Sequence, residues 1–110
     1  MLFYLLVSHT ICDFTFQTES MAKGKNRNRK PDMSVVPPGQ NYQPTWVYWL
    51  TSHALIHGGG VALVTGNIWL GISETVAHWL IDFFKCENFY GIYVDQSLHI
   101  ACKFIWLGLA

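Results

Sequence analysis

The histidine and aspartate residues of this chain recur in pairs four positions apart, and each pair lies in a different hydrophobic segment. The four pairs are His9/Asp13, His53/His57, His78/Asp82 and Asp95/His99. Random placement of these residue types would give only about 0.6 such pairs, so chance does not explain the spacing. Side chains four residues apart lie on one face of a helix. The pattern therefore predicts four helices that direct imidazoles and carboxylates towards a common centre.

These residue types are the usual ligands of a transition metal ion. Imidazole nitrogens favour zinc, iron and related ions, and carboxylates add affinity for harder ions such as manganese. We predict one or two divalent ions, with zinc as the first choice and iron or manganese as alternatives. The predicted ligands are His9, Asp13, His53, His57, His78, Asp95 and His99.

The depth of each residue along its helix gives an independent test of convergence, at a rise of about 1.5 Å per residue. Depth is measured inward from the presumed cytoplasmic end of each predicted helix. One layer, at a depth of about 9 to 12 Å, holds Asp13, His53, His78 and His99. A second layer, at roughly 16 to 18 Å, holds His9, His57 and Glu74. Separate segments thus place their polar residues at the same levels, as a shared site requires.

A metal ion in such a cluster points to hydrolysis. A bound cation lowers the pKa of a water molecule and supplies hydroxide as a nucleophile. Glu74 or Asp82 is predicted to act as general base, because burial raises a carboxylate pKa towards the useful range. Gln17 and Gln96 are predicted to orient ligands or water. Lys85 is predicted either to hold a substrate phosphate or to anchor a helix at a membrane interface.

The composition favours a membrane protein with a single domain. Of the 110 residues, 51% are hydrophobic and only 13% are charged, whereas soluble domains average about 25% charged residues. Hydrophobic segments close to the ~20 residues that a bilayer crossing requires cover residues 2–21, 45–65, 68–85 and 94–110. We therefore predict an all-α integral membrane bundle of four transmembrane helices, with both termini on the same side.

A polar loop is predicted over residues 22–44, and it contains a basic cluster at residues 23–30. Because cytoplasmic loops are rich in Lys and Arg, this loop is placed in the cytoplasm and both termini outside, in a prokaryotic inner membrane. Besides setting the topology, the cluster could contact anionic lipid headgroups or a phosphorylated substrate. No aromatic stacking platform is interleaved with the charges, so no nucleic acid partner is expected.

Small residues form a ladder on the second hydrophobic segment, at Ala54, Gly58 and Ala62. Such a surface lets another helix approach closely, so we expect tight packing beside His57, and self-association is permitted. The three cysteines show no C-x-x-C spacing, and they are expected to be small buried apolar residues rather than part of a zinc finger.

The order of the motifs resembles one protein family over nearly the whole chain. The motifs are His9-x3-Asp13-Phe14-x2-Gln17, His53-x3-His57, His78-x3-Asp82-x2-Lys85 and Asp95-Gln96-x2-His99. In this order they resemble an uncharacterised family of small bacterial and phage membrane proteins, domain of unknown function 3307. The resemblance implies a multi-helix membrane protein of a prokaryote or its virus and brings no established activity. The chain is also distantly similar to families labelled membrane-bound metal-dependent hydrolases.

The leading functional hypothesis is a membrane-embedded, metal-dependent hydrolase that acts on a lipid or a lipid-linked phosphate at the cytoplasmic leaflet. Three non-enzymatic hypotheses stay open: a proton- or ion-conducting or metal-transporting protein, a phage lysis or exclusion protein, and a subunit of a larger complex. The segments Val61–Val64 and Ile105–Leu109 contain no ionisable group. They favour a pocket that is open at one end over a continuous pore.

Overall fold

The computed structural model describes residues 1–29, 36–41 and 44–110. Within these residues the chain forms helices and no strand, which confirms the all-α prediction. The helices are α1 (Leu2–Thr10), the π-helix η1 (Ile11–Thr15), α2 (Glu19–Gly24), α3 (Trp46–Thr65), α4 (Ile68–Cys86) and α5 (Ile92–Leu109).

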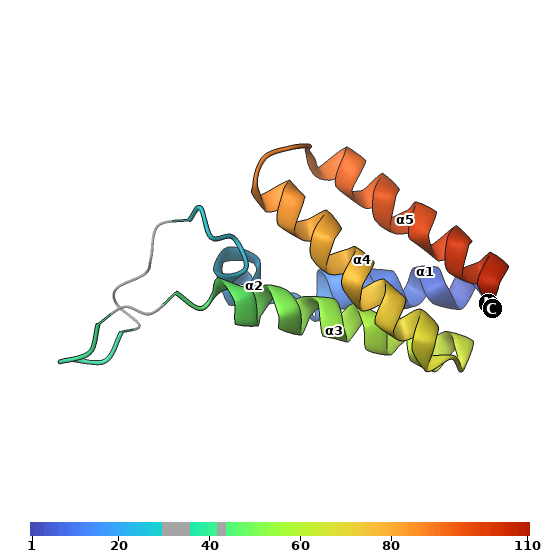
Figure 1. Cartoon of the computed structure of the whole chain (residues 1–110), viewed down its shortest axis with the longest axis horizontal. Helices are drawn as coiled ribbons and strands as arrows, with labels where there is room; N and C mark the ends of the chain where they lie inside the picture. The colour runs from blue at the N-terminus through green and yellow to red at the C-terminus, as the bar shows by residue number, and fades with distance from the viewer. Residues whose placement is uncertain (30–35, 42–43) are drawn as a thin grey trace.

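Four rods form the body of the molecule: α1 continued by η1, then α3, α4 and α5, each running opposite to the rod before it (Figure 1). Helix α1 begins and α5 ends at the same end of the bundle (Figure 1). The short helix α2 lies at the other end, beside the start of α3 (Figure 1). There, a Cβ added to Gly24 would lie only 2.5 Å from the indole of Trp49. The backbone at the end of α2 therefore packs directly on α3.

The connection between α3 and α4 is a tight turn with a cap on each side. Gly66 ends α3 with a φ of 67°, a conformation that favours glycine. Asn67 then caps α4, because its side-chain oxygen accepts a hydrogen bond from the backbone N–H of Trp69. The turn holds the two helices side by side along their length.

The ladder of small residues lies at this contact between α3 and α4. A Cβ added to Gly71 of α4 would lie 2.7 Å from both the carbonyl oxygen of Gly58 and the Cβ of Ala62. A Cβ added to Gly58 would lie 2.6 Å from the carbonyl oxygen of Gly71. The two backbones are therefore as close as the small residues allow, and the helix that packs on the ladder is α4 of the same chain.

The interior of the bundle is more polar than apolar. Among the described residues, eleven buried residues are polar or charged and nine are hydrophobic. The apolar cluster of Leu5, Val61, Leu70 and Trp106 lies towards the end of the bundle that holds the termini. Histidine, carboxylate and lysine side chains occupy the remaining interior, so the bundle is assembled around a polar centre.

The first predicted transmembrane segment is not one helix. Helix η1 ends at Thr15, and Thr18 then caps a new helix by accepting a hydrogen bond from the backbone N–H of Met21. The apolar sequence of helix α4 contains buried charged residues, among them Glu74 and Asp82. Across the part of the chain that the structure describes, no helix combines the length and the apolar character that crossing a membrane requires. The prediction of a transmembrane bundle is therefore not supported.

The predicted location in a prokaryotic inner membrane is wrong for the same reason. Without a membrane-crossing helix among the described residues, there is no basis for a cytoplasmic basic loop and outside termini. The polar loop predicted over residues 22–44 also begins later, since α2 extends to Gly24. Lys30, the last residue of the predicted basic cluster 23–30, lies outside the described residues. Contact with a lipid bilayer or with anionic headgroups stays a prediction.

Candidate metal centre

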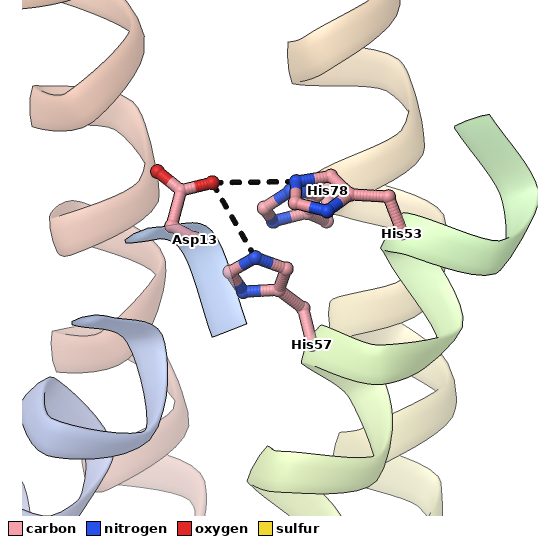
Figure 2. Close-up of side chains that lie close together, drawn as sticks. All are labelled: Asp13, His53, His57 and His78. Atoms are coloured by element: carbon pink, nitrogen blue, oxygen red, sulfur yellow. Dashed lines mark ion pairs between the residues drawn. The ribbon is translucent and has the colours of Figure 1, made fainter. Parts of the chain in front are cut away.

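Four of the predicted ligands meet in the interior of the bundle, and we call them the Asp13 group: Asp13, His53, His57 and His78. One ligand atom of each residue lies within 4.8 Å of the corresponding atoms of the other three, and all four residues are buried. Asp13 comes from η1, the two neighbouring imidazoles from α3, and His78 from α4. Figure 2 shows the three imidazoles and the carboxylate directed towards one another.

Local helix geometry explains how these side chains come to face the interior. His53 and His57 are four residues apart on α3 and therefore share one face of that helix. Asp13 lies in the five-residue π-helix η1. Single turns of π-helix occur mostly as insertions in α-helices and frequently at functional sites. The wider turn thus marks the point where the first rod contributes its carboxylate.

The distances within the Asp13 group are those of metal ligands. Nε2 of His53 lies 3.3 Å and Nε2 of His57 lies 3.5 Å from Oδ1 of Asp13 (dashed lines in Figure 2). Neither nitrogen has a hydrogen-bond partner within the described residues. Two ligand atoms at 2.0–2.1 Å from a tetrahedral zinc ion are separated by about 3.3–3.4 Å. Each nitrogen therefore lies from the carboxylate oxygen at close to the distance between two corners of a zinc coordination tetrahedron.

Burial controls the charge of the group. It lowers the pKa of His57 to about 3, an effect that the nearby Asp13 carboxylate only partly offsets. Burial also lowers the pKa of His78 and that of His9. For Asp13, burial opposes ionisation, but the facing nitrogens of His53, His57 and Gln96 outweigh it and hold the pKa well below its usual range. At neutral pH His57 and His78 are thus neutral and Asp13 is ionised, the protonation states that metal binding requires.

Asp13 also differs from the other buried carboxylates in its charge partners. Three carboxylates each face a lysine ammonium: Glu74 faces Lys103 at 2.7 Å, Asp82 faces Lys25 at 2.7 Å, and Asp95 faces Lys85 at 3.8 Å. Within the described residues, no lysine or arginine forms an ion pair with Asp13. An ionised carboxylate without a cation is costly in a protein interior. Its charge is therefore available to a bound metal ion.

Gln96 connects the Asp13 group to a second layer of polar residues. Its amide nitrogen donates a hydrogen bond to Oδ2 of Asp13 at 2.7 Å, and its amide oxygen lies 3.0 Å from Nε2 of His9. These contacts fit the predicted orienting role of Gln96. The arrangement places His9 beyond the amide, 3.8 Å from the Asp13 carboxylate, rather than among the four converging donors.

A second set of donors shares one imidazole with the first, and we call it the Glu74 group: Glu74, His78 and His99. Both carboxylate oxygens of Glu74 are engaged, since Oε1 accepts a hydrogen bond from Lys103 Nζ and Oε2 accepts one from Trp106 Nε1. Nε2 of His99 lies 3.3 Å from Oδ1 of Asp95. The predicted ligands His99 and Asp95 thus lie outside the Asp13 group.

The other predicted site residues, Asp82, Gln17 and Lys85, lie next to the Asp13 group or at the rim of the bundle. Oδ2 of Asp82 is 3.7 Å from Nε2 of His53, next to the Asp13 group, and it accepts a hydrogen bond from Lys25. Gln17 also accepts a hydrogen bond from Lys25. Lys85 is partly exposed and faces Asp95, in the rim of the bundle. Its proposed substrate contact therefore has to compete with a carboxylate.

Two buried lysines were not predicted as part of the site. Lys103 continues the four-residue spacing of Asp95 and His99 along α5, and this signal was available in the sequence. Lys25 had no such signal, because it meets Asp82 across 57 positions of the chain. It belongs to the basic cluster 23–30, where a solvated charge was expected, yet its side chain is only 5% exposed.

Comparisons with known proteins give a family and no activity. The family model described as protein of unknown function (DUF3307) matches residues 1–108 of the chain. No curated protein and no solved structure matches it. The match to the family confirms the resemblance that the order of the motifs indicated.

Proposed function

Since the chain belongs to the DUF3307 family, whose function is unknown, we propose a function from the site itself: the protein binds one divalent transition metal ion at the Asp13 group. The observation that carries this proposal is the convergence of His53 and His57 on one oxygen of Asp13, at tetrahedral spacing and without hydrogen bonds. A buried polar atom without a partner costs about 1–3 kcal/mol. Ligation of one ion would satisfy these atoms together.

The donor set favours zinc. Three imidazoles and one carboxylate suit zinc, iron, copper or nickel, whereas magnesium and calcium prefer oxygen ligands throughout. Zinc also has no electronic preference that opposes a tetrahedral shell. Iron or manganese are the alternatives that the same residues would hold with added water ligands.

The charge of the interior supports a single ion. Four carboxylates are buried, and three of them, Glu74, Asp82 and Asp95, each face a lysine. With the imidazoles counted as neutral, as ligation requires, Asp13 is the buried carboxylate left without a cation among the described residues. One metal ion at the Asp13 group would be its counter-ion.

The geometry supports a fold-stabilising role for this ion most directly. Four protein donors fill a tetrahedral shell, as in structural zinc sites, while catalytic sites keep a position for water. All members of the Asp13 group are buried, which suits an ion that is retained rather than exchanged. In this role the ion joins η1, α3 and α4, the three elements that supply its ligands.

Metal-dependent hydrolysis of a phosphate ester, including the lipid-linked phosphate suggested by the sequence, is the second candidate. The observation that favours it is the Lys25–Asp82 ion pair beside His53. If Asp13 leaves the ion to open a position for water, Asp82, 3.7 Å from Nε2 of His53, is a carboxylate for a general base and Lys25 is a cation for a phosphate oxygen. Glu74 is less suited as base, because both of its oxygens already accept hydrogen bonds.

Elemental analysis of protein purified without a histidine tag tests metal binding. The wild type is expected to hold one equivalent of a transition metal, and the His53→Ala/His57→Ala variant none. The matched control is His99→Ala, which removes an equally buried imidazole outside the Asp13 group and should retain the ion. Equal metal content in wild type and the double variant would refute the site.

Spectroscopy of the cobalt(II)-loaded protein distinguishes the structural role of the ion from the hydrolase role. Azide binds to a metal that has an open or exchangeable position and changes the visible absorption of cobalt. No change with azide is expected for the closed, structural site. A change with azide would move the assignment to the hydrolase, and phosphate-ester hydrolysis that Asp82→Asn abolishes would then establish it.

A further inference from the structure

The buried carboxylate of Glu74 is held by hydrogen bonds beside one of the proposed metal ligands. Glu74 lies one helical turn before His78 on α4, and both side chains are 1% exposed or less. Lys103 and Trp106, from α5, each donate a hydrogen bond to one of its carboxylate oxygens. The carboxylate is therefore held in a fixed position next to an imidazole of the Asp13 group.

Both ring nitrogens of His78 are buried and have no hydrogen-bond partner within the described residues. Nδ1 lies 3.5 Å from Oε1 of Glu74, and this leaves Nε2, across the ring, for the other members of the Asp13 group. A histidine that ligates a metal through one nitrogen usually donates its other N–H to a carboxylate. The two unpartnered nitrogens of His78 fit these two roles.

A second metal ion at the Glu74 group is the competing explanation for the same atoms. Against it, the ammonium of Lys103 lies 2.7 Å from the only Glu74 oxygen that is close to His78. Both side chains of this ion pair are 1% exposed, so water screens little of the repulsion that a divalent ion would meet there. A second divalent ion would also add two positive charges to an interior in which Glu74, Asp82 and Asp95 each already face a lysine. Charge thus favours an outer carboxylate over a second site.

We infer that Glu74 is a positioning residue of the metal centre: it accepts the Nδ1–H of His78, so that His78 binds the ion through Nε2, while Lys103 and Trp106 hold the carboxylate in place. This inference rests on the proposed metal site. The 3.5 Å separation is longer than a formed hydrogen bond. A metal on Nε2 makes the Nδ1–H a better donor, and the contact is expected to shorten when the ion is bound.

Metal titration of Glu74→Gln tests the role, since the amide is the same size as the carboxylate but a weaker acceptor. The affinity for zinc or cobalt(II) should fall about 10- to 100-fold, with one equivalent still bound at saturation. Because Glu74→Gln leaves Lys103 without its partner, the double variant Glu74→Gln/Lys103→Met serves as a second test with both charges removed. It should show the same loss of affinity.

Asp95→Asn is the matched control. Asp95 and His99 form another buried carboxylate–imidazole pair four residues apart, but His99 is not a member of the Asp13 group. This variant should bind the ion with wild-type affinity. A loss equal to that of Glu74→Gln would show a general effect on the fold instead of positioning of His78.

Nitrogen NMR of zinc-loaded protein labelled at histidine provides a readout that a purely structural role would not move. The ring of His78 is expected to carry a proton on Nδ1 and the metal on Nε2. Ligation through Nδ1, or unchanged affinity in both Glu74 variants, would overturn the inference and leave the metal site in place. Two equivalents in the wild type and one in Glu74→Gln would establish a second ion instead. No metal in the wild type would refute both proposals.

Discussion

Lys103 and Glu74 form an ion pair across α4 and α5, with 2.7 Å between Nζ and Oε1 and both side chains 1% exposed. Such a pair contributes little net stability compared with a well-packed apolar pair, but the loss of one partner leaves an uncompensated charge in the interior. The pair therefore constrains which substitutions the bundle tolerates next to its polar centre.

Lys103→Met should lower the free energy of unfolding by about 3–5 kcal/mol, because Glu74 then remains buried without a cation. Urea denaturation of metal-free protein measures this change. Glu74→Gln/Lys103→Met removes both charges and should cost clearly less than Lys103→Met alone. If the single and double variants are equally stable, the ion pair does not exist in solution.

The stability of the metal-free protein should decrease as the pH falls. Burial lowers the pKa of His57 from 6.5 to about 3, and the pKa values of His78 and His9 move in the same direction. Between pH 6.5 and pH 3 the unfolded chain therefore binds more protons than the folded chain, and the free energy of unfolding falls as acid is added. Each such histidine contributes up to about 1.4 kcal/mol per pH unit.

Urea denaturation at a series of pH values checks this dependence. His57→Gln should show a shallower slope than the wild type, because one of the titrating groups is absent. A free energy of unfolding that stays constant from pH 7 to pH 4 would show that these imidazoles are accessible to solvent and not buried in the folded protein.

Zinc should stabilise the folded protein against heat. A ligand that binds only the folded state adds about 4 kcal/mol when its free concentration is 1,000 times Kd. The Tm of metal-free protein should rise when zinc is added and fall again with a chelator. Magnesium should have no effect, and His53→Ala/His57→Ala should not respond to zinc. A zinc-induced rise of the same size in that variant would place the ion elsewhere.

Substitution of the glycines tests the close packing of α3 on α4. Gly71→Ala should destabilise the fold by about 1–3 kcal/mol, since the new Cβ would lie 2.7 Å from the carbonyl oxygen of Gly58. Gly59→Ala is the control, because a Cβ there meets nothing within 4 Å. It should stabilise α3 by about 0.5–1 kcal/mol. Thermal unfolding of the two variants should therefore shift Tm in opposite directions.

The helix bounds and the ladder of small residues show most clearly which features local sequence predicted. The ranges predicted for α3, α4 and α5 differ from the observed bounds by two residues at most. The ladder at Gly58 packs where a helix was expected to approach, beside the imidazoles. The first segment was predicted poorly, because its apolar composition hid the π-helix η1 and the new helix capped by Thr18. Hydrophobicity alone also predicted four transmembrane helices, whereas none of the described helices is long and apolar enough to cross a membrane.

The sequence by itself determined which side chains share a helix face, because the spacing of four residues is a local property of the helix backbone. It thereby identified the imidazoles and carboxylates that face the interior. Only the tertiary structure decided which of them meet: His57 joins Asp13, His53 and His78, while His99 pairs with Asp95. Rotation and sliding of one helix against another depend on packing contacts between distant segments, and no local pattern encodes them.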